Sequence, residues 1–221
     1  MGAEIFGLVR DLGGLAPDAR LLDLGCGAGR LVEPLRRFLG PAGSYEGLDI
    51  VPEFVAWNRR WVTPVDPRFR FRRAAVRNDA YHPRGEPAES YAFPYRDGEF
   101  DLVVASSLFT HLLAPAARRY LGESARVLRP GGRLFATFFL LDDEVLARMA
   151  GHRADLAFPW PVPYGRIADP AQPEFAVAHE AWALEAALAE ADLRPVAGWR
   201  RGKWSGVEGT TYQDLVIAER A

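Results

Sequence analysis

The sequence predicts an α/β protein with an open, mostly parallel sheet, and two features near its start carry that prediction. The apolar run 21–24 breaks into a glycine-rich turn over 25–29 and continues directly into a helical pattern. Alternate glycines let the backbone of such a turn pass close to a ligand. A second apolar run ends at Asp49, 20 residues beyond Gly29. An acid there can accept both hydroxyls of a ribose, as in nucleoside binding by open α/β sheets.

Strands and helices alternate along most of the chain. We expect seven strands, over 20–24, 45–49, 69–76, 100–105, 134–141, 195–200 and 211–218. We expect helices over 2–14, 30–39, 52–61, 115–128, 144–152 and 180–191. Gly13 and Gly14 end the first helix, and Pro52 opens the third because proline is well tolerated in the first helical turn. After the fourth helix, Pro130 stops the helix and two glycines reverse the chain.

Composition limits the class of protein. A chain of 221 residues suits one α/β domain with a full core, so we expect a single domain over 1–221. The net charge of -2 gives no general attraction to nucleic acid or to an anionic membrane, and no apolar run approaches the ~20 residues of a membrane span. A single cysteine excludes an internal disulfide, so we expect a reducing, cytoplasmic location. The oligomeric state does not follow from the sequence.

The glycine turn discriminates between two ligands. A dinucleotide fingerprint has the spacing G-x-G-x-x-G, whereas here the third glycine comes one residue early. Asp23, at the tip of the first strand, would repel a pyrophosphate but suits the ammonium group of an amino-acid tail. S-adenosylmethionine combines a ribose with an amino-acid end and carries no phosphate. The turn therefore favours S-adenosylmethionine as the cofactor.

Three motifs together resemble the class I S-adenosylmethionine-dependent methyltransferases. They are D-x-G-C-G-x-G at 23–29, a segment similar to L-P-F-x-D-x-x-F-D-x-V at 93–103, and R-P-G-G at 129–132. The resemblance covers most of 15–218. It implies the Rossmann-like fold of that family, with a seven-stranded, mostly parallel sheet, an antiparallel last strand and helices on both faces.

The resemblance also implies a cofactor site. The methionine tail is expected against Asp23, Gly25, Gly27 and Gly29, with Cys26 and Arg30 of the same turn beside it. Cys26 could instead be a reactive thiol, although packing against the ligand suits its place in the turn better. Asp49 is expected to hold the ribose, and Ile50 to cover the adenine.

The sequence leaves alternatives for two parts of the expected cofactor site. By the family's alignment, Glu89 and Ser90 contact the adenine edge, but Asn78 and Asp79 follow the third strand directly and could take that role. Ser106 and Ser107 end the fourth strand, where they either contact the cofactor near its methyl group or only cap the strand.

The candidate catalytic residue is His111, which lies just past the fourth strand. A hydroxyl acceptor must lose its proton during methylation, and histidine titrates near neutral pH. The alternative is that His111 only packs against the next helix or bonds to a backbone carbonyl.

An insertion at about 142–175 is expected to cover the pocket. We expect Phe109, Trp160 and Tyr164 to contact the acceptor, unless the aromatic side chains of the insertion fill a small core of their own. Asp142 and Asp143 either cap the following helix or bind a divalent cation, and capping is favoured because no third hard ligand is evident. No metal site is therefore expected.

The sequence predicts a methyltransferase that O-methylates a hydroxyl of a small molecule, such as a sugar or a secondary metabolite. N- or C-methylation of a small molecule is the nearest alternative. A nicotinamide-dependent oxidoreductase is disfavoured by the glycine spacing and by Asp23, and a non-catalytic scaffold by the intact set of acids and glycines. Nucleic acid is not expected as a partner, because the chain lacks the N/D-P-P-Y/F motif of amino-methylating DNA enzymes and is slightly acidic.

Overall fold

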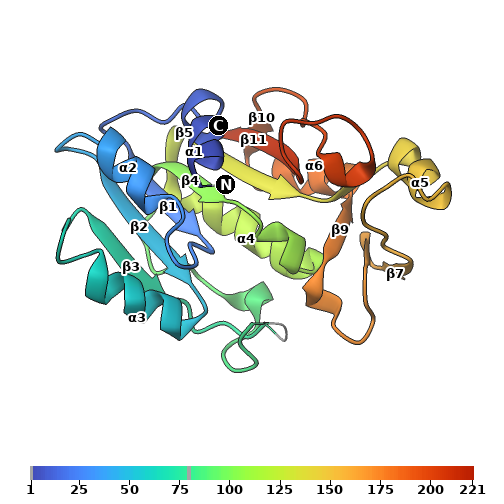
Figure 1. The fold of residues 1–221 in the computed structure, drawn as a ribbon, viewed down its shortest axis with the longest axis horizontal. Coiled ribbons are helices and arrows are strands. Elements are labelled where there is room, and N and C mark those ends of the chain that lie inside the picture. Colours follow the sequence, from blue (N-terminus) through green and yellow to red (C-terminus); the bar gives the residue numbers. More distant parts are fainter. Residues whose placement is uncertain (1, 79–80) are drawn as a thin grey trace.

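The computed structural model describes residues 2–78 and 81–221, and a seven-stranded sheet forms its centre (Figure 1). The strand order is β10-β11-β5-β4-β1-β2-β3. The strands are β1 (Arg20–Leu24), β2 (Ser44–Asp49), β3 (Phe69–Arg73), β4 (Phe100–Ala105), β5 (Leu128–Phe138), β10 (Leu193–Pro195) and β11 (Asp214–Arg220). Strand β11 is antiparallel to both of its neighbours, and the other adjacent pairs are parallel. The predicted Rossmann-like sheet, with an antiparallel last strand, is confirmed.

Helices cover both faces of this sheet. They are α1 (Gly2–Asp11), α2 (Val32–Phe38) and α3 (Pro52–Trp61) on one face, and α4 (Ala114–Val127) and α6 (Ala181–Glu190) on the other. Successive residues of a strand point to opposite faces. In β1, Leu21 accordingly packs with the first group of helices, and Leu22 and Leu24 pack with the second. Both faces of β1 are thus buried, as its apolar run predicts.

The strand order reverses between β1 and β4, which lie side by side although 75 residues separate the end of β1 from the start of β4. Ligands of open α/β sheets bind outside the carboxyl ends of the strands at such a switch point. A ligand-binding site is therefore expected at this edge of the sheet.

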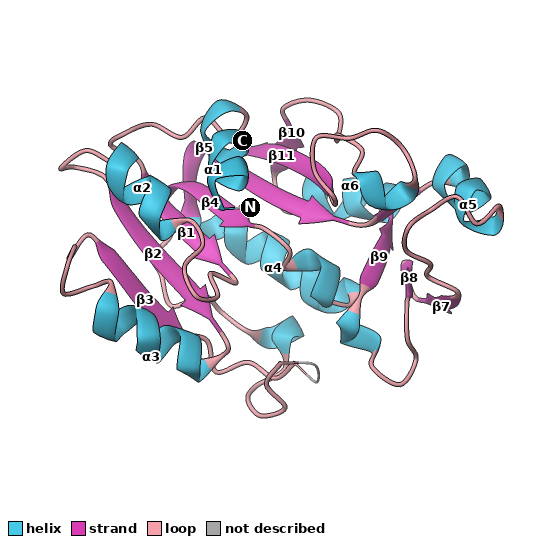
Figure 2. Ribbon diagram, in the orientation of Figure 1, coloured by secondary structure: helices cyan, strands magenta, loops and turns pink. Residues whose placement is uncertain are grey.

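The insertion and the residues on either side of it form a second, four-stranded sheet that the sequence did not predict (Figure 2). Its strands are β6 (Leu140–Leu141), β7 (Trp160–Val162), β8 (Gly165–Ile167) and β9 (Val177–Glu180), in the order β6-β9-β8-β7. The helix α5 (Asp143–Ala150) and the 3-10 turn η3 (Pro173–Phe175) lie between them. Strands of two to four residues are too short to show a period-2 pattern in the sequence. Phe139, Phe158 and Trp204 are the largest side chains of the separate core that this region builds.

Several strand boundaries differ from the predicted ones, among them those of the last strand, which is Asp214–Arg220 and not 211–218. Strand β3 ends at Arg73, and Val76 makes only an isolated bridge to Glu86. Strand β5 begins at Leu128, so the R-P-G-G segment is an irregularity within the strand rather than a turn before it. Strand β10 ends at Pro195, although Val196 N still donates a hydrogen bond to the carbonyl oxygen of Ile217 at 2.9 Å.

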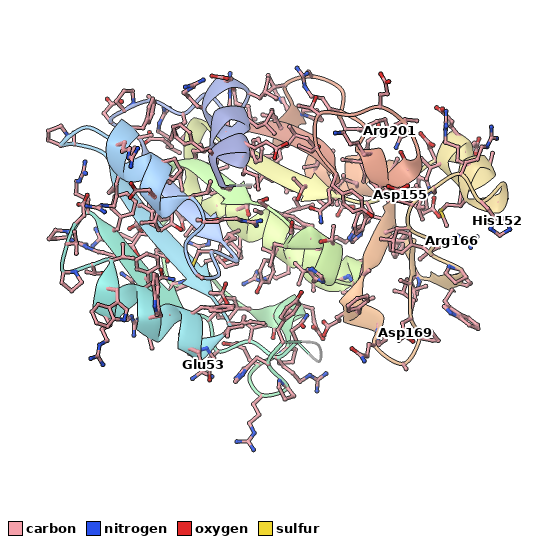
Figure 3. The ribbon with its side chains drawn as sticks, in the orientation of Figure 1. Glu53, His152, Asp155, Arg166, Asp169 and Arg201 are labelled. Carbon is pink, nitrogen blue, oxygen red and sulfur yellow. The ribbon has the colours of Figure 1, made fainter. Side chains whose placement is uncertain are left out.

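A buried carboxylate ties the last strand to the insertion. Asp214, at the start of β11, is fully buried and accepts three hydrogen bonds. The donors are Leu140 N at 2.7 Å, Gly202 N at 2.8 Å and Trp204 Nε1 at 2.8 Å. Figure 3 shows Arg201 above Asp155 at this end of the molecule.

We expect Asp214→Ala to lower the free energy of unfolding by about 3–5 kcal/mol, because it leaves three buried donors without an acceptor. Urea denaturation measures the change. The matched control is Asp155→Ala, because the side chain of Asp155 is exposed. This substitution should change the free energy of unfolding by less than about 0.5 kcal/mol. Equal effects of the two substitutions would contradict this role of Asp214.

No helix within 2–78 and 81–221 is long and apolar enough to cross a bilayer.

Candidate functional site

A cavity opens at the carboxyl ends of β1, β2 and β4, where the strand order reverses. Half of the residues predicted for the site line it: Gly25, Gly27, Arg30, Asp49, Ile50, Ser106, Ser107 and His111. They come from segments up to 86 positions apart in the chain and meet at one end of the sheet. The cavity therefore brings the glycine turn, the acid after β2 and the candidate base together.

Asp49 organises the glycine turn while keeping capacity for a ligand. Its Oδ2 accepts a hydrogen bond from Gly27 N at 2.7 Å, and its Oδ1 accepts one from Val51 N at 2.8 Å. A carboxylate offers about four acceptor positions, so each oxygen can still accept one more bond. Gly27 has φ +54°, a conformation that a residue with a side chain rarely adopts. The arrangement leaves Asp49 able to hold two neighbouring hydroxyls.

Arg30 joins the turn after β1 to the end of β4. Its Nη2 donates to the carbonyl oxygen of Ser106 at 2.6 Å, and its side chain lines the cavity. A guanidinium in this place can also bind an anionic group of a ligand.

Ser107 occupies a strained position in the cavity wall. Its φ is +59°, which is uncommon for a residue other than glycine. Its N–H donates to Thr137 Oγ1 at 2.8 Å, and its hydroxyl donates to Gln213 Oε1 at 3.0 Å. Thr137 Oγ1 donates to the same oxygen of Gln213 at 2.6 Å. Residues of β5 and of the segment before β11 thus hold the end of β4 in place.

His111 lies in the cavity wall on the 3-10 turn η2 (Phe109–His111), and both of its ring nitrogens have partners. Nδ1 lies 3.1 Å from the carbonyl oxygen of Glu174, and Nε2 lies 3.3 Å from the hydroxyl of Tyr81. Burial lowers the pKa of His111, and hydrogen bonding to the carbonyls of Glu174 and Phe175 opposes that shift. The ring is therefore neutral near pH 7 and able to take up a proton.

Asp23 lies behind the glycine turn and does not line the cavity. It is 3% exposed and accepts a hydrogen bond from the Tyr45 hydroxyl at 2.7 Å. Desolvation raises its pKa to about 6, although the bond from Tyr45 and the charge of Arg30 act in the opposite direction. The expected contact with an ammonium group has no support in this position, because the carboxylate is turned into the protein.

We expect the stability of the protein to depend on pH through Asp23. The folded-state pKa of about 6 exceeds the ordinary value of 3.8, so the stability that protonated Asp23 contributes is present below pH 3.8 and is lost as the pH rises through 6. Asp23→Asn removes this titration while keeping an acceptor for Tyr45. Between pH 4 and pH 7.5 the free energy of unfolding of the wild type should therefore fall by about 2 kcal/mol relative to that of Asp23→Asn.

Urea denaturation at the two pH values measures this gain. The exposed Asp18 provides the matched control, Asp18→Asn. A difference between Asp23→Asn and the wild type that does not change with pH would contradict the raised pKa.

Cys26 and Gly29 belong to the glycine turn, but neither of them lines the cavity. Cys26 is 2% exposed, and burial together with Asp23 and Asp49 raises the pKa of its thiol well above the ordinary value. Cys26 is thus a packed, protonated thiol. A Cβ on Gly29 would lie 2.8 Å from Asn58 Oδ1 and 2.8 Å from Val32 Cγ2. Gly29 is required for the close packing of the turn against α2 and α3.

The two residues expected at the adenine edge, Glu89 and Ser90, do not line the cavity. Glu89 and Ser90 belong to a 3-10 turn whose Ala88, but neither of them, lines the cavity. Arg77 and Asn78, which follow β3, line it instead. Asp79 lies outside the described residues. The segment that follows β3 lies at the cavity because it begins at the carboxyl end of that strand.

None of the three aromatic residues expected at the acceptor lines the cavity. Phe109 is fully buried in the core and stacks on Phe138 with ring centroids 4.6 Å apart. Trp160 and Tyr164 are about half exposed on the insertion, where Tyr164 packs against Trp182 of α6. These positions give no support to the expected contacts.

Sequence reasoning missed several cavity residues, chiefly Phe54, Tyr81 and Tyr120. Tyr81 belongs to the long connection after β3, and long loops at the carboxyl edge of a sheet often carry function. That signal could have found Tyr81. Phe54 and Tyr120 lie inside helices, and no local pattern distinguishes them from other apolar residues.

Asp142 caps α5, as favoured from the sequence, because its side chain accepts a hydrogen bond from Val145 N at 2.9 Å. It also forms an ion pair with Arg201. In the part of the chain that the structure describes, no three His, Cys, Asp or Glu side chains are grouped to hold a metal ion.

Comparison with known proteins decides the family. Residues 22–136, just over half of the chain, match the family model described as "Methyltransferase domain". The chain belongs to the class I S-adenosylmethionine-dependent methyltransferase family. The chain is 31% identical over 209 residues to 27-O-demethylrifamycin SV methyltransferase of Amycolatopsis mediterranei, and the match covers 91% of this chain and 67% of the relative.

Other relatives match a shorter part of the methyltransferase. Arsenite methyltransferase of Halobacterium salinarum is 30% identical over 120 residues, which cover 54% of this chain and 27% of the relative. The chain thus spans about a third or less of the arsenite methyltransferases that it matches. The solved structure of 1,6-didemethyltoxoflavin-N1-methyltransferase from Burkholderia thailandensis has the same fold. Its TM-score is 0.62 at 18% identity, with 100% of this chain and 78% of that one covered.

Proposed function

We propose that this methyltransferase transfers the methyl group of S-adenosylmethionine to a hydroxyl oxygen of a small molecule. The observation that carries the proposal is His111, a neutral imidazole in the cavity wall whose Nε2 lies 3.3 Å from a hydroxyl oxygen, that of Tyr81. Methylation of an alcohol or phenol requires a group that takes the hydroxyl proton.

The residues of the cavity fit the cofactor. Asp49 keeps two acceptor positions for the ribose hydroxyls, and Arg30 offers its guanidinium to the methionine carboxylate. Ile50 and Asn78 also line the cavity, and we expect them to contact the adenine. With Asp23 and Cys26 behind the turn, the tail of the cofactor meets the backbone of Gly25 and Gly27 and not an acidic side chain.

When bound, S-adenosylmethionine supplies an electrophilic methyl group. The acceptor oxygen gains this methyl group and loses its proton to Nε2 of His111. The positive charge that leaves the donor sulfur therefore reappears on the imidazole ring, and the net charge of the cavity is unchanged. Alignment of the reacting groups by the cavity wall supplies the rest of the rate enhancement, which can reach roughly 7–11 kcal/mol in well-ordered cases.

Two observations support a hydroxyl group on a mainly apolar molecule as the acceptor. The relative with 31% identity over most of this chain is named for an O-demethylated compound, which makes a hydroxyl the first acceptor to test. Apart from its polar ends the cavity is walled by side chains such as Leu24, Leu108, Leu112 and Tyr120, which suit an acceptor with an apolar body.

Transfer of an isotope-labelled methyl group tests the proposal. The protein is incubated with labelled S-adenosylmethionine and a panel that contains 27-O-demethylrifamycin SV, simple phenols, sugars and the corresponding amines. We expect label in a methyl ether. Label on nitrogen or carbon alone would overturn O-methylation and favour the alternative reactions, and calorimetric heat with NADH but none with S-adenosylhomocysteine would overturn the choice of cofactor.

A further inference from the structure

The partners of His111 determine which ring nitrogen carries its hydrogen. Nδ1 lies 3.1 Å from the carbonyl oxygen of Glu174. A carbonyl oxygen accepts hydrogen bonds and cannot donate, so Nδ1 must be the protonated nitrogen of the neutral ring. Nε2 then has a lone pair, which accepts the hydrogen bond from Tyr81 at 3.3 Å. The lone pair of His111 is therefore on the nitrogen next to the cavity residue Tyr81.

The carbonyl that fixes Nδ1 comes from the insertion. Glu174 is the middle residue of η3, which packs against the turn η2 that carries His111. A second contact secures η2 from the same region, because His179 of β9 donates from Nε2 to the carbonyl oxygen of Phe109 at 3.0 Å. Glu174 of the insertion thus contacts the last residue of η2, and His179, just beyond the insertion, contacts the first.

We propose that Glu174 is a positioning residue, whose backbone carbonyl holds His111 in the Nδ1–H tautomer and so directs the basic Nε2 toward the acceptor. This inference rests on the proposed function, in which Nε2 takes the acceptor proton. It assigns the insertion a defined task at the reaction centre, which neither its sequence nor its exposed aromatic residues indicate.

Two chemical consequences follow from this arrangement. When Nε2 takes a proton the ring becomes an imidazolium, and the carbonyl of Glu174 stabilises the positive charge through the Nδ1–H that it already holds. The hydroxyl of Tyr81 occupies the lone pair that the acceptor hydroxyl must reach. Tyr81 therefore marks where the acceptor oxygen binds and is displaced from Nε2 when an acceptor enters.

The tautomer can be observed directly by ¹⁵N NMR of histidine-labelled protein at pH 8, where His111 and His179, whose pKa values burial lowers, are neutral. No acceptor is needed. We expect His111 as the Nδ1–H tautomer and His179, whose Nε2 donates to a carbonyl, as the Nε2–H tautomer in the same spectrum. The sequence has four histidines, so His111→Gln and His179→Gln assign the signals. A predominant Nε2–H tautomer at His111 would overturn the proposal.

A variant of η3 tests whether the insertion causes the tautomer. Pro173, Glu174 and Phe175 are all replaced by glycine, which frees the carbonyl; none of the three is buried, so the fold should survive. The control carries Pro170→Gly and Ala171→Gly at exposed positions just before the turn. We expect the Nδ1–H share of His111 to fall at least twofold in the triple variant only. An unchanged share in the triple variant, with the His179 signal intact, would overturn the role of Glu174.

Failure of this inference can be told apart from failure of the proposed function. A wrong tautomer, together with loss of methyl transfer in His111→Gln, removes the role of Glu174 and leaves His111 as the base. Full methyl transfer in His111→Gln removes the base, and with it the purpose of the positioning, whatever the tautomer.

Discussion

Asp49→Ala should weaken the binding of S-adenosylhomocysteine at least tenfold, which corresponds to about 1.4 kcal/mol or more of binding free energy. The substitution removes the two acceptor positions proposed for the ribose hydroxyls. It also removes the acceptor of Gly27 N and that of Val51 N, so the glycine turn loses an anchor on its cavity side. Isothermal titration calorimetry measures the affinity.

Two controls separate binding from folding in this experiment. Glu89→Ala changes an exposed acid outside the cavity and should leave the affinity within twofold. Asp49→Asn keeps one acceptor oxygen and should fall between the wild type and Asp49→Ala. An unchanged affinity in a folded Asp49→Ala protein would refute the placement of the ribose.

His111→Gln should lower kcat for methylation of a hydroxyl acceptor by about 10²–10⁴, because the variant lacks the group that takes the acceptor proton. The affinity for S-adenosylhomocysteine should stay within a few-fold of the wild type. Methyl-transfer assays with the acceptor found in the panel measure the effect. His152→Gln is the matched control, since His152 is exposed at the far end of α5 (Figure 3).

The pH profile provides a second measurement of the same residue. Burial lowers the pKa of His111, so the ring should stay neutral and active down to a pH below the ordinary value of 6.5. Activity should then fall as the pH drops further, because a protonated imidazole cannot accept a proton. A His111→Gln enzyme of wild-type rate, or a rate that does not fall in acid, would refute the base.

The parts of the fold that the sequence predicts well are those with strong local signals. The strand and turn over 20–29 and the helix that Pro52 opens have the predicted places, since apolar runs, glycines and prolines determine them locally. The small sheet of the insertion escaped because its strands are two to four residues long. Such strands form only where other segments supply their partners.

In the candidate site, too, residues with a strong local signal could be predicted, whereas contacts between distant segments could not. Asp49 and His111 could be found because Asp49 ends an apolar strand and His111 lies in the first turn after another, at the edge where ligands bind. The orientation of Asp23 could not, because it depends on Tyr45 in the neighbouring strand, whose hydroxyl turns the carboxylate inward. Nor could the contact of Glu174 with His111, which depends on how the insertion folds back over η2.

The independent core around Phe139, Phe158 and Trp204 bears on how such an enzyme can diversify. Its side chains are separate from the two clusters that flank the seven-stranded sheet. Residue changes there can alter the packing of the insertion without disturbing the core beneath Asp49 and the glycine turn. The insertion is therefore free to vary in sequence while the cavity edge of the large sheet stays the same.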